Sequence, residues 1–127
     1  MKVLIIDGQG GGLGRQLVAA VKEYDRSIEV LAVGTNSAAT NAMLKAGADQ
    51  AATGENSVAV ASKKADVIMG PVGIVIADSM LGEITPRMAV AVGQSSAKRI
   101  LIPVNLCDNI VVGVSDVSMG KNVQNAV

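Results

Sequence analysis

A glycine-rich turn lies between an apolar run and a helical pattern near the start of the chain. Five of the seven residues in 8–14 are glycine, and the four residues before Asp7 are Val, Leu, Ile and Ile. That apolar run predicts a buried strand, whereas the apolar side chains after the turn recur at helical spacing, namely Leu13, Leu17, Val18 and Val21. A strand that passes through a glycine turn into a helix presents unpaired backbone N–H groups to an anion. The sequence therefore predicts a turn that binds phosphate.

The glycines also allow a second interpretation, in which they only permit a tight turn between strand and helix. Each glycine costs about 0.5–1 kcal/mol of conformational entropy relative to alanine. Gly10, Gly11 and Gly12 follow one another, which is a large cost for a turn alone. A bound ligand is the favoured explanation. We expect Gly10 and Gly11 to face it and Gly14 to pack the helix on the strand.

Composition excludes several classes of protein. The 127 residues, half of them apolar, fit one domain with one core. Eleven basic residues balance eleven acidic ones, and Tyr24 is the one aromatic residue, which argues against a nucleic-acid partner. The lone Cys107 and the lack of histidine exclude an internal disulfide and a Cys/His metal site, and they suit a reducing cytoplasm. The longest apolar run, residues 67–77, is shorter than the ~18–20 residues that span a bilayer.

Strand and helix patterns alternate along the chain. The predicted strands are residues 3–6, 28–33, 50–52, 66–69, 100–104 and 110–114. The predicted helices are the one after the glycine turn, 37–46, 57–64 capped by Asn56, 74–81, and one from Thr85 and Pro86 to about residue 92. Such alternation predicts an α/β fold with a mostly parallel sheet covered on both faces. The last strand follows too closely for a helical crossover and should pair antiparallel or leave the sheet, and the tail after about residue 116 is expected to be loosely ordered.

Small and polar residues follow the carboxyl ends of these strands. Ligands of open α/β sheets bind outside those ends. The candidate binding residues are Gly8, Gln9, Gly10, Gly11, Gly12, Leu13, Gly14, Thr35, Asn36, Thr53, Gly70, Pro71, Gly73 and Asn105. A plainer reading is that strand-to-helix turns favour Gly, Asn and Thr for steric and capping reasons.

The spacing of Gly8, Gly12 and Gly14 resembles the dinucleotide loop of short-chain dehydrogenases. Asp7 stands where that family has threonine, and Gly34 and Thr35 stand where an acidic residue would hold the adenosine ribose. The catalytic Tyr-x-x-x-Lys of those enzymes is missing. Because the acidic residue typical of NAD sites is absent, NADP or another nucleotide is the cofactor to consider. Because the catalytic motif is missing, hydride transfer is not expected.

Taken together, the motifs resemble a family of short bacterial proteins with a domain of unknown function. They are IDGQGGG at 6–12, GTN at 34–36, ATGEN at 52–56, GPVGI at 70–74 and MLGEITP at 80–86. The resemblance implies a Rossmann-like three-layer α/β/α sandwich whose mostly parallel sheet has about five to six strands. It brings no catalytic residues.

Three functions remain open at this stage. The leading one is binding of a nucleotide, dinucleotide or related phosphorylated metabolite by the glycine turn, with sensing as a role. The second is a small enzyme that acts on a phosphorylated substrate with Asp7, Glu55 or Asn105. The third is an interaction protein without a ligand. We expect a homo-oligomer such as a homodimer, because residues 74–77 with Met80 and Leu81 form more apolar surface than a short helix buries.

Asp7 would place a negative charge beside the phosphate. A carboxylate within about 4 Å of a phosphate is costly unless protons or a cation intervene. Asp7 is therefore expected either to accept hydrogen bonds from N–H groups of the turn or to bind a divalent ion. Asp7, Glu55, Asp78 and Glu83 are candidates for a metal or general-base pair, although carboxylates after strands also cap helices. Cys107 is expected to be a small buried side chain.

Overall fold

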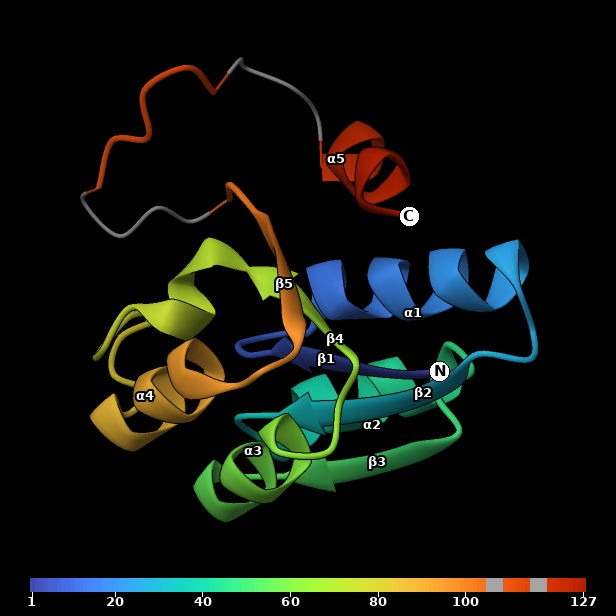
Figure 1. Ribbon diagram of the computed structural model, residues 1–127, viewed down its shortest axis with the longest axis horizontal. Coiled ribbons are helices and arrows are strands. Elements are labelled where there is room, and N and C mark those ends of the chain that lie inside the picture. Colours follow the sequence, from blue (N-terminus) through green and yellow to red (C-terminus); the bar gives the residue numbers. More distant parts are fainter. Residues whose placement is uncertain (105–108, 115–118) are drawn as a thin grey trace.

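A five-stranded parallel sheet forms the middle of the structure, a computed structural model that describes residues 1–104, 109–114 and 119–127 (Figure 1). The strand order is β3-β2-β1-β4-β5, and every pair of neighbours is parallel. The strands are β1 (Lys2–Asp7), β2 (Glu29–Gly34), β3 (Gln50–Thr53), β4 (Val67–Pro71) and β5 (Lys98–Ile102). The chain moves from β1 outward to β3 and then crosses back to β4. Its direction therefore reverses between β1 and β4.

The central strand β1 is apolar on both of its faces. Val3 and Ile5 belong to the apolar cluster on one side of the sheet, while Leu4 and Ile6 belong to the cluster on the other side. All four side chains are at most 4% exposed. A strand that is buried on both faces reads as an unbroken apolar run, which is why residues 3–6 do not alternate with polar ones.

Helices cover both faces and complete a Rossmann-like three-layer α/β/α sandwich (Figure 1). The cluster on one face takes side chains from α1 (Gly12–Tyr24), α2 (Ser37–Lys45) and α5 (Met119–Ala126). The cluster on the other face takes them from α3 (Glu55–Ser62), the 3₁₀ turn η1 (Val72–Val75) and α4 (Pro86–Gln94). Helix α5 lies against α1 and β5. The predicted α/β fold with a parallel sheet is confirmed.

The start of the third helix was predicted two residues too late. The helix begins at Glu55 after Gly54, whose φ of 106° only glycine adopts readily, so Asn56 lies inside the helix and does not cap it. A carboxylate in the first turn complements the helix dipole, and this favours the earlier start. In contrast, Thr85 caps α4 as predicted, and its hydroxyl accepts a hydrogen bond from the Met88 N–H.

Two other predicted elements are absent. Residues 74–81 do not form a helix, because the 3₁₀ turn ends at Val75 and the backbone of Asp78, Met80 and Leu81 then has φ values of 65°, 56° and 56°. Residues 110–114 form a turn and no strand. Helix α5 occupies most of the tail that was expected to be loosely ordered. The predicted strand at 100–104 ends before Pro103 and is an edge strand, which fits the rule that proline is excluded from central strands.

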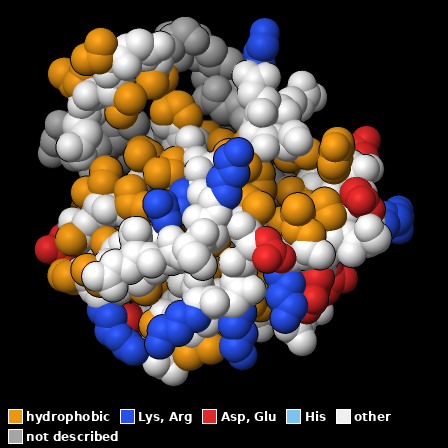
Figure 2. All heavy atoms as spheres, viewed as in Figure 1, with side chains coloured by type: hydrophobic (Ala, Val, Ile, Leu, Met, Phe, Trp, Pro, Cys, Tyr) orange, Lys and Arg blue, Asp and Glu red, His pale blue; other side chains and the backbone are white. Residues whose placement is uncertain are grey.

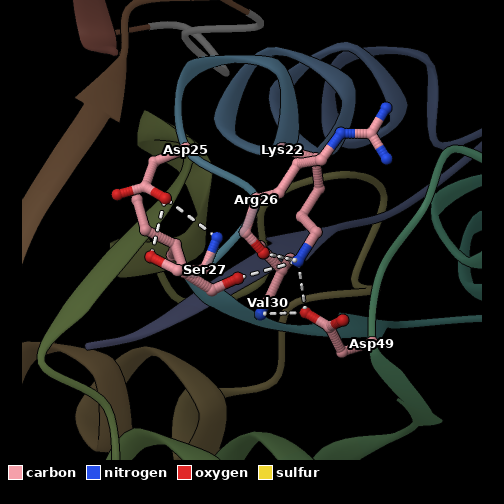
Figure 3. Close-up of polar contacts among 7 residues, drawn as sticks. Lys22, Asp25, Arg26, Ser27, Val30 and Asp49 are labelled. Atoms are coloured by element: carbon pink, nitrogen blue, oxygen red, sulfur yellow. Dashed lines mark hydrogen bonds and ion pairs between the residues drawn. The ribbon is translucent and has the colours of Figure 1, made fainter.

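An ion pair ties two turns together at the amino-terminal edge of the sheet (Figure 3). Lys22 Nζ donates to the carbonyl oxygen of Ile28 at 2.8 Å, to that of Arg26 at 3.2 Å and to Asp49 Oδ2 at 2.8 Å. The same Asp49 oxygen accepts a hydrogen bond from the Val30 N–H at 2.8 Å. The turn after α1 is thereby joined to the turn before β3.

We predict that the stability supplied by Asp49 disappears in acid. Hydrogen bonds from Lys22 and the Val30 N–H lower the pKa of the Asp49 carboxyl below 3.8. Its contribution is therefore present above the unfolded value and is lost as pH falls through the lower folded value. Urea unfolding should show Asp49→Asn less stable than the parent at neutral pH by about 0.2–1 kcal/mol, the range for exposed pairs. This difference in stability should shrink below about pH 4. The control Glu23→Gln should be as stable as the parent at neutral pH. A difference that grows in acid would contradict this assignment.

Candidate functional site

The glycine turn between β1 and α1 is short and closed by one backbone hydrogen bond. The Gly11 N–H donates to the Gly8 carbonyl at 2.9 Å. Gly11 precedes the first helical residue and has a φ of 74°, and Gln9 has a φ of 50°. Two left-handed residues in three turn the chain from the strand directly into the helix. The predicted strand, glycine turn and helix are all present.

Three of the five glycines are required by packing. A methyl group on Gly11 would lie 2.8 Å from Cα of Ala39 in α2. On Gly14 it would lie 2.6 Å from Sδ of Met43, and on Gly8 it would lie 2.7 Å from Oγ1 of Thr35. The prediction that Gly11 faces a ligand is wrong, because its Cα side is covered by α2. The structural role predicted for Gly14 matches this contact.

The other two glycines have open space beside them. A methyl group on Gly10 or Gly12 would meet no atom of the described chain within 4 Å. In the described part of the chain, the N–H groups of Gly10, Gly12 and Leu13 donate no hydrogen bond. These N–H groups lie at the N-terminus of α1, where the helix dipole favours an anion.

Asp7 bridges the strand end and the first turn of α1. Its Oδ1 accepts a hydrogen bond from the Gly8 N–H at 2.8 Å, and its Oδ2 accepts one from the Gly14 N–H at 2.7 Å. The residue is 6% exposed. Burial raises the pKa of Asp7, the two N–H bonds oppose this rise, and the charge of Glu83 adds to it. Of the two roles considered for Asp7, the geometry matches hydrogen bonding to the turn.

Glu83 brings a second carboxylate to the same place from a distant part of the chain. Its Oε1 accepts three hydrogen bonds, from the Gln9 N–H at 2.9 Å, the Thr35 hydroxyl at 2.5 Å and the Asn36 amide at 2.8 Å. Asn36 also caps α2 through its Oδ1, which accepts from the Ala39 N–H at 2.9 Å. The predicted residues Gln9, Thr35 and Asn36 therefore do come together, and they meet at Glu83.

Sequence reasoning named Glu83 only as one of four carboxylates for a metal or general-base pair and did not place it beside the glycine turn. Nothing local links it to the strand ends, since its partners Thr35 and Asn36 are 48 and 47 residues away. The one available signal was the absence of an acidic residue after β2. A carboxylate near the end of β2 can therefore come from a segment that is distant in the sequence.

The end of β4 forms the other wall of the switch point between β1 and β4. Gly70, Pro71 and Gly73 are buried there. The Ser79 hydroxyl donates to the Gly73 carbonyl at 2.5 Å, and Met80 packs within 3.6 Å of where a Gly73 methyl would lie. The segment of residues 76–83 thus packs over this strand end, close to the glycine turn.

Thr53 and Glu55 lie at the end of β3 and the start of α3. The Thr53 hydroxyl is hydrogen-bonded to that of Thr40 at 2.7 Å. Glu55 accepts from Thr85 at 2.6 Å and pairs with Arg87 at 3.4 Å. Among the described residues, Asp7 and Glu55 share no hydrogen-bond partner. Asn105 and Cys107 lie outside the described residues.

The described residues contain neither a cluster of metal ligands nor a membrane-spanning helix. In that part of the chain, no group of three or more Cys, Asp or Glu side chains is arranged to hold a metal ion. No helix there is long and apolar enough to cross a bilayer.

The apolar run expected at an oligomer interface is only partly buried within the chain. Ile74 and Met80 are 0% and 5% exposed, and they join the cluster that contains Ile84. Leu81 differs, with 99% of its surface exposed. Ile74 and Met80 are therefore not available to an interface, and an interface at the half-buried Val75 and Ile76 and the exposed Leu81 stays a prediction.

Two hollows lie away from the glycine turn. One of about 400 Å³ lies beside α3 and is lined by Leu31, Val33, Ala52 and Val60, with Lys2 and Lys64 also on its wall. Figure 2 shows Lys and Arg side chains gathered along the lower edge of the molecule, around the place that α3 occupies in Figure 1. The other, of about 680 Å³, is lined by residues that include Lys22 and Asp49. Neither contains a residue of the glycine turn.

Comparison with known proteins gives a family and a fold. The family described as Domain of unknown function (DUF3842) matches residues 2–127, so the chain belongs to that family. No curated protein matches it. Among solved structures, it is similar to the crystal structure of a dodecameric FMN-dependent UbiX-like decarboxylase from Escherichia coli O157:H7. The two are 19% identical, the match covers 99% of this chain and 74% of that one, and the TM-score is 0.53. This likeness shows the fold alone.

We predict opposite effects for alanine at neighbouring positions of the turn. Gly11→Ala should lower the free energy of unfolding by more than about 1–2 kcal/mol, because it forces a left-handed alanine against α2. Gly10→Ala should change it by no more than about 0.5 kcal/mol, because its methyl group meets open space. Chemical unfolding of the two variants beside the parent measures both values. Equal stability of the two variants would contradict the packing described above.

Proposed function

We propose that this chain binds a nucleotide or a related phosphorylated metabolite, with a phosphate on the N–H groups of Gly10, Gly12 and Leu13. The observation that carries this proposal is the set of three unbonded N–H donors at the start of α1, beside two glycines without steric cover. Their position supports it further. They lie where the sheet changes direction between β1 and β4, the usual ligand site of open α/β sheets.

The nearby carboxylates favour one kind of phosphate over another. Asp7 and Glu83 both place negative charge by the turn. A terminal phosphate with two negative charges would be repelled more strongly than a bridging phosphate with one. A pyrophosphate inside a dinucleotide therefore fits this turn better than a phosphate monoester does.

The fold relative adds a compound to test. That protein is described as FMN-dependent, so FMN belongs among the trial ligands together with NAD, NADP, ATP and AMP. Its low identity transfers no binding residue to this chain. The chain has no tryptophan, which makes calorimetry the practical assay.

We predict that Gly12→Ala stabilises the protein and weakens the binding of its ligand. A helical Cβ leans toward the N-terminus, so the methyl group would extend toward the N–H donors that hold the phosphate. Stability should rise by about 0.4–1 kcal/mol, as for other compatible Gly→Ala changes. Affinity should fall about tenfold or more. Gly93→Ala is the matched control, because Gly93 lies in α4 and a methyl group there also meets open space. It should raise stability without changing affinity.

Two results of this calorimetry would count against the proposal. One is a parent protein that binds none of the five compounds at millimolar concentration. The other is a Gly12→Ala variant that binds as tightly as the parent. The first result would favour the interaction-protein alternative, and the second would place the ligand away from the N–H groups of the turn.

A homo-oligomer is a separate part of the proposed function. The fold relative is described as dodecameric, and Leu81 holds an apolar side chain fully in solvent. If a second copy covers Leu81, the Leu81→Lys variant should have a lower sedimentation coefficient than the parent. Val90→Lys, on the exposed side of α4, should sediment like the parent. A parent that sediments as a monomer at tens of micromolar would remove this proposal.

A further inference from the structure

The end of β2 lacks the residue that holds ribose in many dinucleotide sites. There, an acidic side chain about 20 residues beyond the glycine turn accepts hydrogen bonds from ribose hydroxyls. Here the last residue of β2 is Gly34, followed by Thr35. Neither side chain is a carboxylate.

Glu83 places a carboxylate at this position. The Thr35 hydroxyl donates to its Oε1 at 2.5 Å, and the Gln9 N–H of the glycine turn donates to the same atom at 2.9 Å. Oε1 therefore lies between the end of β2 and the turn that follows β1. Glu83 is partly exposed, and within the described chain its Oε2 accepts no hydrogen bond. One oxygen is fixed by the protein, and the other remains available.

The segment around Glu83 holds this carboxylate in place. The Asp78 N–H donates to the Ile84 carbonyl at 2.7 Å, and the Gly82 N–H donates to the Asp78 carbonyl at 3.1 Å. Ile84 is fully buried, and Met80 packs beside Gly8. The turn is thus anchored on both sides of its exposed tip.

The hydrogen bonds also keep Glu83 charged. Burial alone would raise the pKa of this carboxyl, but the donors from Thr35, Gln9 and Asn36 outweigh it and hold the pKa below its usual value. An ionised carboxylate with a fixed oxygen and an available one is suited to accept from neighbouring hydroxyl groups.

We propose that Glu83 binds the ribose of the ligand through Oε2, and that the ligand carries a free 2′-hydroxyl. This inference rests on the proposed function, since it assigns the sugar of the same nucleotide whose phosphate lies on α1. It also sets a preference among dinucleotides. A 2′-phosphate would meet the charge of Glu83 and be rejected, so NAD fits this site and NADP does not.

A different role for Glu83 predicts the opposite effect. In this second role, the Glu83 carboxylate only accepts hydrogen bonds from Gln9, Thr35 and Asn36 until a ligand displaces it. Neutralising Glu83 would then tighten the binding of every nucleotide by a similar factor. If it binds ribose, neutralising it changes the preference between ligands that differ at the 2′ position. The ratio of two affinities separates these roles, because the general effect of charge cancels.

The test compares the parent with Glu83→Gln by calorimetry against two ligand pairs, ATP with 2′-deoxy-ATP and NAD with NADP. Glutamine keeps an oxygen that can accept from Thr35, Gln9 and Asn36, so the variant should fold, which its thermal unfolding checks. The parent should prefer ATP and NAD by about tenfold or more. Glu83→Gln should reduce both preferences to about threefold or less. Glu29→Gln removes the same charge at the opposite edge of the sheet and should keep the preferences of the parent.

Each contrary result has its own meaning. A parent that binds ATP and 2′-deoxy-ATP equally overturns the ribose assignment while the proposed function stands. Tighter binding of all four ligands by Glu83→Gln with unchanged ratios overturns it in favour of displacement. A parent that binds none of the four overturns the assignment and, for these ligands, the proposed function with it.

Discussion

The hydrogen bonds of Asp7 join the central strand to the first helix, and the geometry of the site depends on them. The carboxylate reaches from the end of β1 to the Gly14 N–H in the first turn of α1, while its other oxygen accepts from Gly8. This close approach needs glycine at position 14, where a methyl group would meet both Asp7 and Met43. The helix start is therefore fixed against the sheet, and the remaining N–H groups of the turn are presented at a defined position.

The site is divided between donors that the protein uses and donors that it leaves. Asp7 takes the N–H groups of Gly8 and Gly14, and Glu83 takes that of Gln9. Within the described chain, the N–H groups of Gly10, Gly12 and Leu13 donate to neither carboxylate. A ligand at this turn thus meets both N–H donors and negative charge, which is the combination that a phosphate diester linked to a sugar satisfies. The carboxylates that argue against a bare phosphate are the groups that argue for a ribonucleotide.

Local pattern predicted the parts of this structure that local interactions determine. The apolar run of β1, the glycine turn, and the Thr85 cap of α4 each depend on neighbours in sequence, and all three are present. Glu83 depends on partners almost 50 residues away, so no periodicity indicates it. The packing of Gly11 against α2 was missed for a related reason, because the sequence of the turn does not contain Ala39 of α2. Ile74 and Met80 fill the core from an irregular segment, and the apolar composition of residues 74–81 resembles that of a short helix.

The central claim is that a nucleotide phosphate lies on three particular backbone N–H groups. Amide ¹H–¹⁵N spectra recorded during titration with NAD test it most directly, since each N–H reports its own hydrogen bonding. We expect the amides of Gly10, Gly12 and Leu13 to move downfield in proton shift. Those of Gly8 and Gly14, already bound by Asp7, should move less. Shifts confined to residues that line the hollow beside α3, such as Val60 and Lys64, or no shift at millimolar NAD, would contradict it.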